Sequence, residues 1–284
     1  MCDNNIGLAH VENLGSREGI LAAKSEIFDY MQDDGVCVLN DDDDLLRNLA
    51  LEKMAEGKDV ITYSVNNPKA TVWADDLHLG LYTQSCNINY KGESIKVEIP
   101  LPGVHMTSNA LAAAAVGFYL GLSFEEVKAG IELFKPSKNR MDITVCGDIE
   151  VINDVYNANP ESMEAAISIL NGSQNRTVAI LGDMFELGEF AQEQHYKVGK
   201  IAAGCGVHSL ICIGGLSRHI YDGFIRHKDE AQEAFYYETK EECGEGVNSL
   251  LKPKDTVLVK ASRGMGFEYF IDILKCREKA QHGI

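Results

Sequence analysis

The chain has 284 residues, of which 45% are hydrophobic and 24% charged, the balance of a soluble globular protein with one large or two ordinary domains. Its formal net charge of −17 argues against nucleic-acid and anionic-membrane partners, which such a charge repels. No segment approaches the ~18 consecutive apolar residues of a membrane span, and residues 1–5 lack the features of a secretory signal. The eight cysteines are scattered without metal-ligand spacing, which indicates reduced thiols and a cytoplasmic location.

The first half of the chain predicts a mixture of helices and strands. Its apolar pattern predicts a helix over about residues 17–31, followed by a strand over residues 35–39. The acidic run 41–44 comes next and is predicted to form a solvated turn rather than a metal site. Residues 61–99 alternate as antiparallel strands do, and an alanine-rich helix is expected over residues 108–120.

The second half predicts a parallel sheet, because short apolar runs alternate there with helical patterns. The expected strands are residues 178–181, 209–213, 235–237 and 257–259. The proline-containing segment 135–139 is the best candidate for a linker, so we expect two domains, residues 1–139 and 140–284. Functional residues of a parallel sheet lie beyond the carboxyl ends of its strands, which directs attention to residues 182–184 and 260–263.

One lysine occupies an unexpected position. In the helix expected over residues 17–31, Ile20 and Phe28 share an apolar face, and Lys24 lies in the middle of that face. A buried ammonium group is unfavourable unless it is paired or chemically altered. The simpler interpretation is a lysine whose long side chain carries its amine to water. His10 lies in the segment before the helix and is placed to share a site with it.

A series of short motifs runs in order along almost the whole chain. They are NIGLAHVE at residues 5–12, AAKSEI at 22–27, NALAA at 109–113, YNANPES at 156–162, GDMFELG at 182–188 and VKASR at 259–263. Each motif is weak alone, but the ordered set resembles the Mur ligases of peptidoglycan synthesis. The resemblance is greatest to the member that joins D-alanyl-D-alanine to the UDP-N-acetylmuramoyl tripeptide.

For residues 1–139 the resemblance implies a central ATP-binding domain of α/β type, here incomplete. His10 and Lys24 would act in catalysis and hold Mg²⁺, with Lys24 carbamylated so that an anionic oxygen group replaces its ammonium. His105 and Asn109 would line the adenine pocket.

For residues 140–284 the resemblance implies a Rossmann-like C-terminal ligase domain. Arg140 and Asp154 would approach the ribose and phosphates of ATP. The site of the amino acceptor would be formed by Asn157, Asn159, Asp183, Lys260, Ser262 and Arg263. An arginine and a helix start suit a carboxylate such as that of the dipeptide.

The implied reaction is ATP-dependent amide-bond formation in peptidoglycan synthesis, the cell-wall pathway that underlies cell shape and division. The tripeptide carboxylate would receive the γ-phosphoryl group of ATP, giving an acyl phosphate, while Mg²⁺ neutralises charge. The amine of D-alanyl-D-alanine would then displace phosphate. The expected protein is a monomer whose partners are the UDP-N-acetylmuramoyl tripeptide and D-alanyl-D-alanine.

The chain departs from the family pattern in two respects. Met106, Asn139 and Asn153 stand where asparagine, glycine and an acidic residue are common. The phosphate-binding loop G-x-x-x-x-G-K-S/T does not occur in the sequence. The family places this loop and a UDP-binding domain further toward the N-terminus, so we interpret the chain as N-terminally truncated. We therefore expect no ATP turnover by the chain alone and lower stability in residues 1–139 than in 140–284.

Other interpretations remain open at this point. The chain could be a non-catalytic binding module that has kept the acceptor domain, or a sister Mur ligase that adds a different amino acid. A nucleotide-dependent oxidoreductase is disfavoured, because no G-x-G-x-x-G follows a strand and residues 213–216 are a poor substitute.

Overall fold

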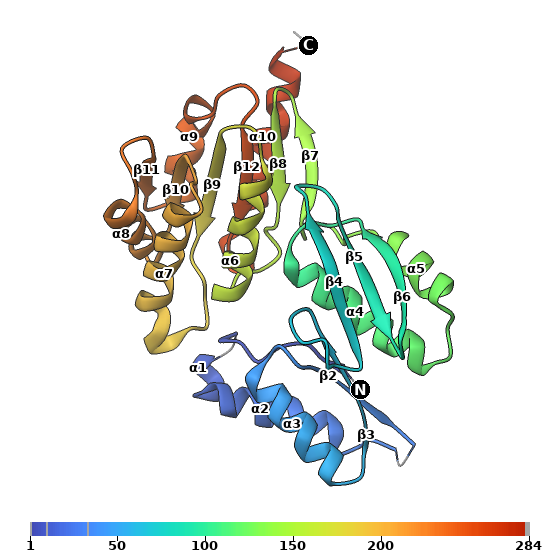
Figure 1. The fold of residues 1–284 in the computed structure, drawn as a ribbon. Helices are drawn as coiled ribbons and strands as arrows, with labels where there is room; N and C mark the ends of the chain where they lie inside the picture. Colours follow the sequence, from blue (N-terminus) through green and yellow to red (C-terminus); the bar gives the residue numbers. More distant parts are fainter. Residues whose placement is uncertain (1, 10, 33, 282–284) are drawn as a thin grey trace. The chain divides into compact units, whose positions relative to one another are not determined.

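The computed structural model describes residues 2–9, 11–32 and 34–281. The chain divides into two compact units, Met1–Lys135 and Pro136–Ile284, which Figure 1 colours from blue to green and from green to red. Each unit contains its own sheet and its own hydrophobic core.

The sheet of the first unit combines parallel and antiparallel pairing. Its order is β1 (Cys2–Asp3), β2 (Val36–Asn40), β3 (Asp59–Ser64), β4 (Val72–Leu79), β5 (Gln84–Tyr90) and β6 (Glu93–Ile99). The antiparallel prediction is confirmed for β4, β5 and β6. It was wrong for β3, which runs parallel to both β2 and β4. Alternation along a strand indicates one buried face, whereas the direction of pairing depends on the connections between strands.

The helices of the first unit are α1 (Val11–Leu14), α2 (Arg17–Ser25), α3 (Asp44–Ala55), α4 (Val104–Tyr119) and α5 (Phe124–Glu132). The alanine-rich α4 packs on the sheet and supplies much of the core, because small side chains allow a close approach. The single helix expected over residues 17–31 was wrong at its C-terminal end. It stops at Ser25 and a short 3₁₀ turn follows.

Residues 41–43 of the acidic run form the predicted turn and Asp44 begins α3. The turn is not solvated as predicted, because Asp41 is buried and the carboxylates of the run bond to neighbouring backbone. Asp43 accepts hydrogen bonds from the first amides of α3 and from Ile6 N. Asp42 accepts from Ser64 Oγ at 2.6 Å and from Val65 N at 2.7 Å. These residues therefore organise the carboxyl ends of β2 and β3.

The sheet of the second unit is parallel except at one edge, and the predicted parallel sheet is confirmed. Its order is β11 (Glu233–Tyr237), β10 (Ser209–Ile213), β9 (Thr177–Gly182), β12 (Thr256–Lys260), β8 (Ile149–Asn153) and β7 (Asp142–Cys146). Only β7 runs antiparallel to its neighbour. The β7–β8 hairpin was not predicted, because its polar residues obscure the apolar pattern.

Helices cover both faces of this second sheet (Figure 1). They are α6 (Pro160–Ile169), α7 (Ala191–Gly204), α8 (Ser217–His227), α9 (Lys240–Leu250) and α10 (Glu268–Gln281). Glycines allow α7 and α8 to approach each other closely: a Cβ atom at Gly199 would lie 1.9 Å from the carbonyl oxygen of Ile220. Among the described residues, no helix combines the length and apolar character needed to cross a bilayer.

Candidate functional site

The second unit gathers most of the predicted site residues at one edge of its sheet. Strands β8, β9 and β12 are parallel neighbours, so their carboxyl ends lie together. Asp154 follows β8, Asp183 follows β9, and Lys260 ends β12 with Ser262 just beyond it. This is the edge at which open parallel sheets carry their ligand sites.

Lys260 and Asp154 are bonded to each other. Lys260 Nζ lies 2.5 Å from Asp154 Oδ2 and 2.9 Å from the carbonyl oxygen of Asn157. The Lys260 side chain is only 2% exposed and that of Asp154 13% exposed. A buried ammonium is stable only with such partners, so Lys260 holds the segment after β8 against the end of β12. The resemblance placed these two residues in different subsites, whereas the structure makes them one pair.

Asp183 and Ser262 hold the loops at this edge in place through hydrogen bonds. Asp183 Oδ1 accepts hydrogen bonds from the backbone N and Oγ of Ser217, both at 2.7 Å, at the start of α8. Ser262 Oγ accepts from Phe185 N at 2.9 Å, and Ser262 N donates to the carbonyl oxygen of Asp183. Both side chains are buried. Their observed role is to join the loops after β9, β10 and β12.

A buried histidine that the sequence analysis missed supports the same loop. His195 on α7 is 0% exposed, and its Nε2 accepts a hydrogen bond from Met184 N at 2.9 Å. Its other nitrogen, Nδ1, donates to the carbonyl oxygen of Ala191 at 2.6 Å. Burial lowers the pKa of His195, because the charged imidazolium is poorly solvated there. The neutral ring therefore fixes the turn that presents Asp183.

Two exposed arginines share one tyrosine ring. The guanidinium carbon of Arg140 lies 3.9 Å from the centre of the Tyr156 ring, and that of Arg263 lies 5.2 Å from it. Both distances allow cation–π attraction. Neither guanidinium forms an ion pair with a residue that the structure describes. The pair thus presents two positive charges that remain available to an anion.

The backbone beside Arg140 explains one departure from the family pattern. Asn139 has a φ of 65°, in the left-handed region that glycine adopts without strain and that asparagine tolerates best among other residues. Its side chain bonds Asn153, with Asn153 Nδ2 donating to Asn139 Oδ1 at 3.0 Å. The two unusual asparagines are therefore partners, and together they stabilise the turn that leads to Arg140.

Asn157 and Asn159, the two remaining residues of the predicted acceptor site, differ in their surroundings. Asn157 is exposed, and its backbone oxygen is the second partner of Lys260. Asn159 is the N-cap of α6, and its Oδ1 accepts from Ser162 N at 2.8 Å. Capping of this kind satisfies a helix amide that would otherwise lack a partner, so the Asn159 side chain already has a structural role.

Lys24, in the first unit, is exposed, in agreement with the simpler of its two interpretations. Its Nζ donates to the carbonyl oxygen of Asn5 at 2.7 Å. The predicted apolar face is buried at Ile20 and Phe28, but the prediction was wrong for Ile27, which the same pattern includes and which is 45% exposed, and for the helix, which ends at Ser25. The predicted metal ligand His10 lies outside the described residues.

His105 and Asn109 lie on the first turns of α4, where His105 is half-buried and Asn109 exposed. Asn109 Oδ1 accepts from Asn4 Nδ2 at 2.5 Å, and Asn109 Nδ2 donates to Met106 Sδ at 3.5 Å. Asn4 also accepts a hydrogen bond from the hydroxyl of Tyr63. This network connects α4 to the parallel part of the first sheet.

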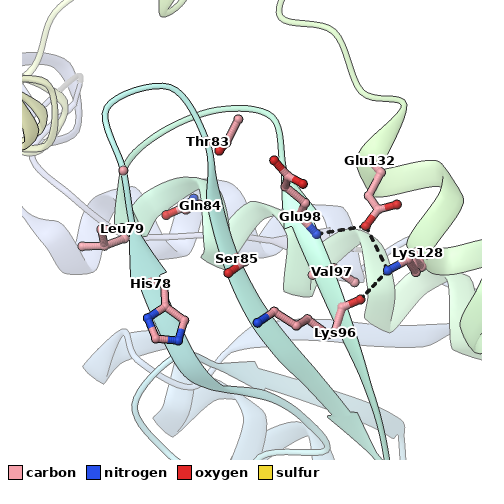
Figure 2. Close-up of a pocket in the computed structure, with 11 residues that line it drawn as sticks. His78, Leu79, Thr83, Gln84, Ser85, Lys96, Val97, Glu98, Lys128 and Glu132 are labelled. Atoms are coloured by element: carbon pink, nitrogen blue, oxygen red, sulfur yellow. Dashed lines mark hydrogen bonds and ion pairs between the residues drawn. The ribbon is translucent and has the colours of Figure 1, made fainter.

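The first unit also contains an open pocket of about 540 Å³ that includes no predicted site residue. It is lined by residues of β4, β5, β6 and α5, among them His78, Ser85, Lys96 and Glu132 (Figure 2). None of the sequence motifs includes a residue that lines this pocket.

The residues missed by the sequence analysis carried only weak signals. Tyr156 lies within the YNANPES motif, but an exposed tyrosine gives no indication of the arginines around it. His195 and Ser217 lie on helices and contact the loop after β9 only through the fold.

Comparisons with known proteins identify two domains. Residues 4–117 match the Mur ligase middle domain, and residues 139–263 match the Mur ligase, glutamate ligase domain. A UDP-N-acetylmuramoyl-tripeptide–D-alanyl-D-alanine ligase of Bacillus subtilis is 32% identical over 273 residues, which are 94% of this chain and 57% of the relative. The corresponding ligase of Escherichia coli is 31% identical over 218 residues, 76% of this chain and 48% of the relative.

Solved structures agree with these matches. A crystal structure of MurF from Acinetobacter baumannii superposes with a TM-score of 0.86 at 26% identity, covering 96% of this chain and 59% of that one. MurF of Thermotoga maritima in complex with ADP has a TM-score of 0.82 at 20% identity, covering 98% of this chain and 61% of that one, and shares the fold. The chain therefore spans a little over half the length of the B. subtilis relative. With both domain models and these relatives in agreement, the chain belongs to the Mur ligase family.

Proposed function

We propose that this chain is the nucleotide- and acceptor-binding part of an ATP-dependent ligase that adds D-alanyl-D-alanine to UDP-N-acetylmuramoyl tripeptide. The relatives named for this activity support the proposal. The structural observation that carries it is the edge of the second sheet, where the Lys260–Asp154 pair lies close in sequence to two arginines that share Tyr156. Substrates, ATP and Mg²⁺ are all part of the proposal.

Arg140 and Arg263 are the groups best suited to bind anions. A guanidinium offers several N–H donors in a plane and matches phosphate or carboxylate oxygens. In the proposal, Arg140 contacts the phosphates of ATP and Arg263 contacts the carboxylate of the dipeptide. Tyr156 orients both groups by its contact with them.

The other residues at this edge of the second sheet hold its loops in position. Lys260 neutralises Asp154 and holds the carbonyl group of Asn157, and Asp183 fixes the start of α8. Such fixed loops matter for an amide-forming reaction, because holding two reactants in register supplies much of the catalysis. Bound ATP would supply the phosphoryl group that activates the tripeptide carboxylate.

The magnesium assignment receives no support from the described residues. Among them, no group of three or more His, Cys, Asp or Glu side chains lies close enough to hold a metal ion. Lys24 Nζ donates to the carbonyl oxygen of Asn5. We keep His10 and a carbamylated Lys24 as proposed ligands and derive no step through the metal. A ¹³C carbamate resonance after equilibration with ¹³C-bicarbonate, absent in Lys24→Arg, would support the modification. Its absence in the wild type would remove Lys24 from the proposal.

Calorimetric titration of the full chain with ADP and with D-alanyl-D-alanine tests the proposed function. Arg140→Ala should weaken ADP binding, and Arg263→Ala should weaken dipeptide binding. Arg226→Ala, an exposed arginine in the last turn of α8, serves as the matched control and should change neither. Dipeptide binding without ADP binding would favour a non-catalytic module, and preference for a different amino acid would favour a sister ligase. Binding of neither ligand would contradict the proposal.

A further inference from the structure

Strand β6 forms one edge of the first sheet. It pairs with β5 along its whole length, from Glu93 to Ile99. Backbone groups of alternate residues in an edge strand point away from the sheet and can bond to another strand. In β6 these include the carbonyl oxygen of Lys96 and the amide of Glu98, which bond to α5 instead of β5.

Two side chains of α5 occupy both of these groups (Figure 2). Lys128 Nζ donates to the carbonyl oxygen of Lys96 at 2.7 Å, and Glu132 Oε1 accepts from the amide of Glu98 at 3.0 Å. Lys128 and Glu132 are one helical turn apart and form an ion pair at 3.1 Å. An added strand would likewise offer an N–H donor and a C=O acceptor to this edge. The ion pair therefore takes the place of such a strand.

The charge state of Glu132 agrees with this arrangement. The hydrogen bond from the Glu98 amide lowers the pKa of the Glu132 carboxyl, and Lys128 acts in the same direction. The side chains remain 38% and 33% exposed for Lys128 and Glu132. Their contacts are thus accessible to competition from water or from another strand.

The sequence of β6 is complementary to itself. If two copies of β6 pair in antiparallel fashion with Val97 opposite the partner's Val97, Lys96 lies opposite the partner's Glu98. By symmetry Glu98 then lies opposite the partner's Lys96. Opposite charges facing each other across strands are favourable, and both residues expose their backbone groups on the outer side. The edge of β6 therefore offers complementary charges and complementary backbone groups to β6 of a second copy of this chain.

We propose that the outer edge of β6 is a pairing surface for β6 of a second copy of this chain, and that the Lys128–Glu132 ion pair keeps this surface closed. The ion pair then keeps the chain monomeric by blocking the two backbone groups that pairing requires.

Sedimentation of the full chain over a range of concentrations tests this proposal. Lys128→Ala/Glu132→Ala removes both blocking groups and leaves net charge unchanged. Each released hydrogen bond contributes about 1 kcal/mol, so the self-association constant should rise about tenfold or more. Lys197→Ala/Glu193→Ala removes a similarly spaced ion pair on α7 and should leave the state of association unchanged. A double variant at the edge that sediments like the wild type would overturn the proposal.

A third substitution identifies the surface that associates. Adding Glu98→Lys to the edge variant places like charges opposite each other in the predicted register and should abolish the association. Association that persists in this triple variant would show that another surface is responsible and would also overturn the proposal.

If the edge variant does not fold, hydrogen exchange of the Glu98 amide in Glu132→Gln provides a second measurement. The amide should exchange faster than in the wild type, because the charged acceptor is lost. An unchanged rate would show that Glu132 does not occupy this amide.

Discussion

Lys260 Nζ lies 2.5 Å from Asp154 Oδ2, although the two residues are separated by 106 positions in the sequence. The pair joins the carboxyl ends of neighbouring strands β12 and β8. It also satisfies a lysine that is almost fully buried. Lys260 contacts the segment that contains Tyr156 at two points, the Asp154 carboxylate and the carbonyl oxygen of Asn157.

Removal of Lys260 should destabilise the second unit. Lys260→Met leaves the Asp154 carboxylate without its partner in a largely buried site, and a loss of about 3 kcal/mol in the free energy of unfolding is expected. Denaturant unfolding, monitored by circular dichroism, measures this change in the free energy of unfolding. Lys260→Met/Asp154→Leu, which removes both charges, should recover part of the loss. A single variant as stable as the wild type would show that the pair is not structurally important.

Tyr156 should act through its ring rather than its hydroxyl group. If the proposed function holds, Tyr156→Phe keeps the face that attracts Arg140 and Arg263, and ligand binding should be unchanged. Tyr156→Leu removes that face and should weaken binding of ADP and of the dipeptide about two- to fivefold. Titration calorimetry distinguishes the two variants. An equal loss of ligand affinity in Tyr156→Phe and Tyr156→Leu would assign the effect to the hydroxyl group instead.

His195 should make the stability of the second unit depend on pH. Its pKa is lowered from 6.5 by burial, so the unfolded chain binds a proton more readily than the folded one. The stabilisation is complete above pH 6.5 and is lost as pH falls below that value toward the lower folded pKa. His195→Gln should flatten this part of the stability profile. His227→Gln is the control, because His227 Nδ1 also bonds to the carbonyl oxygen four residues earlier, that of Gly223.

Gly199 should tolerate no side chain. A Cβ atom there would lie 1.9 Å from the carbonyl oxygen of Ile220, so Gly199→Ala must push α7 and α8 apart. A loss of about 1–3 kcal/mol or more in the free energy of unfolding is expected. Gly204→Ala, at the end of the same helix, meets no atom within 4 Å and should stabilise by about 0.5–1 kcal/mol. Thermal unfolding of both variants checks the contrast.

Much of the second unit could be predicted from local pattern. The strands β9, β10 and β12 are continuous apolar runs buried on both faces, and their alternation with helices indicates a parallel sheet. The first unit was harder to predict. Residues 61–64 lie in the stretch predicted to be antiparallel, yet β3 pairs in parallel with β2, because the chain returns through α3 before β3 begins.

The sequence by itself determined the family, through an ordered set of short motifs, and relatives at about 30% identity agree with it. Tertiary structure alone decided what the residues of the candidate site contact. It paired Lys260 with Asp154, placed Arg140 and Arg263 on Tyr156, and left Lys24 exposed. The physical reason is that a motif records neighbours along the chain, whereas charge pairing and burial depend on strands brought together from distant positions.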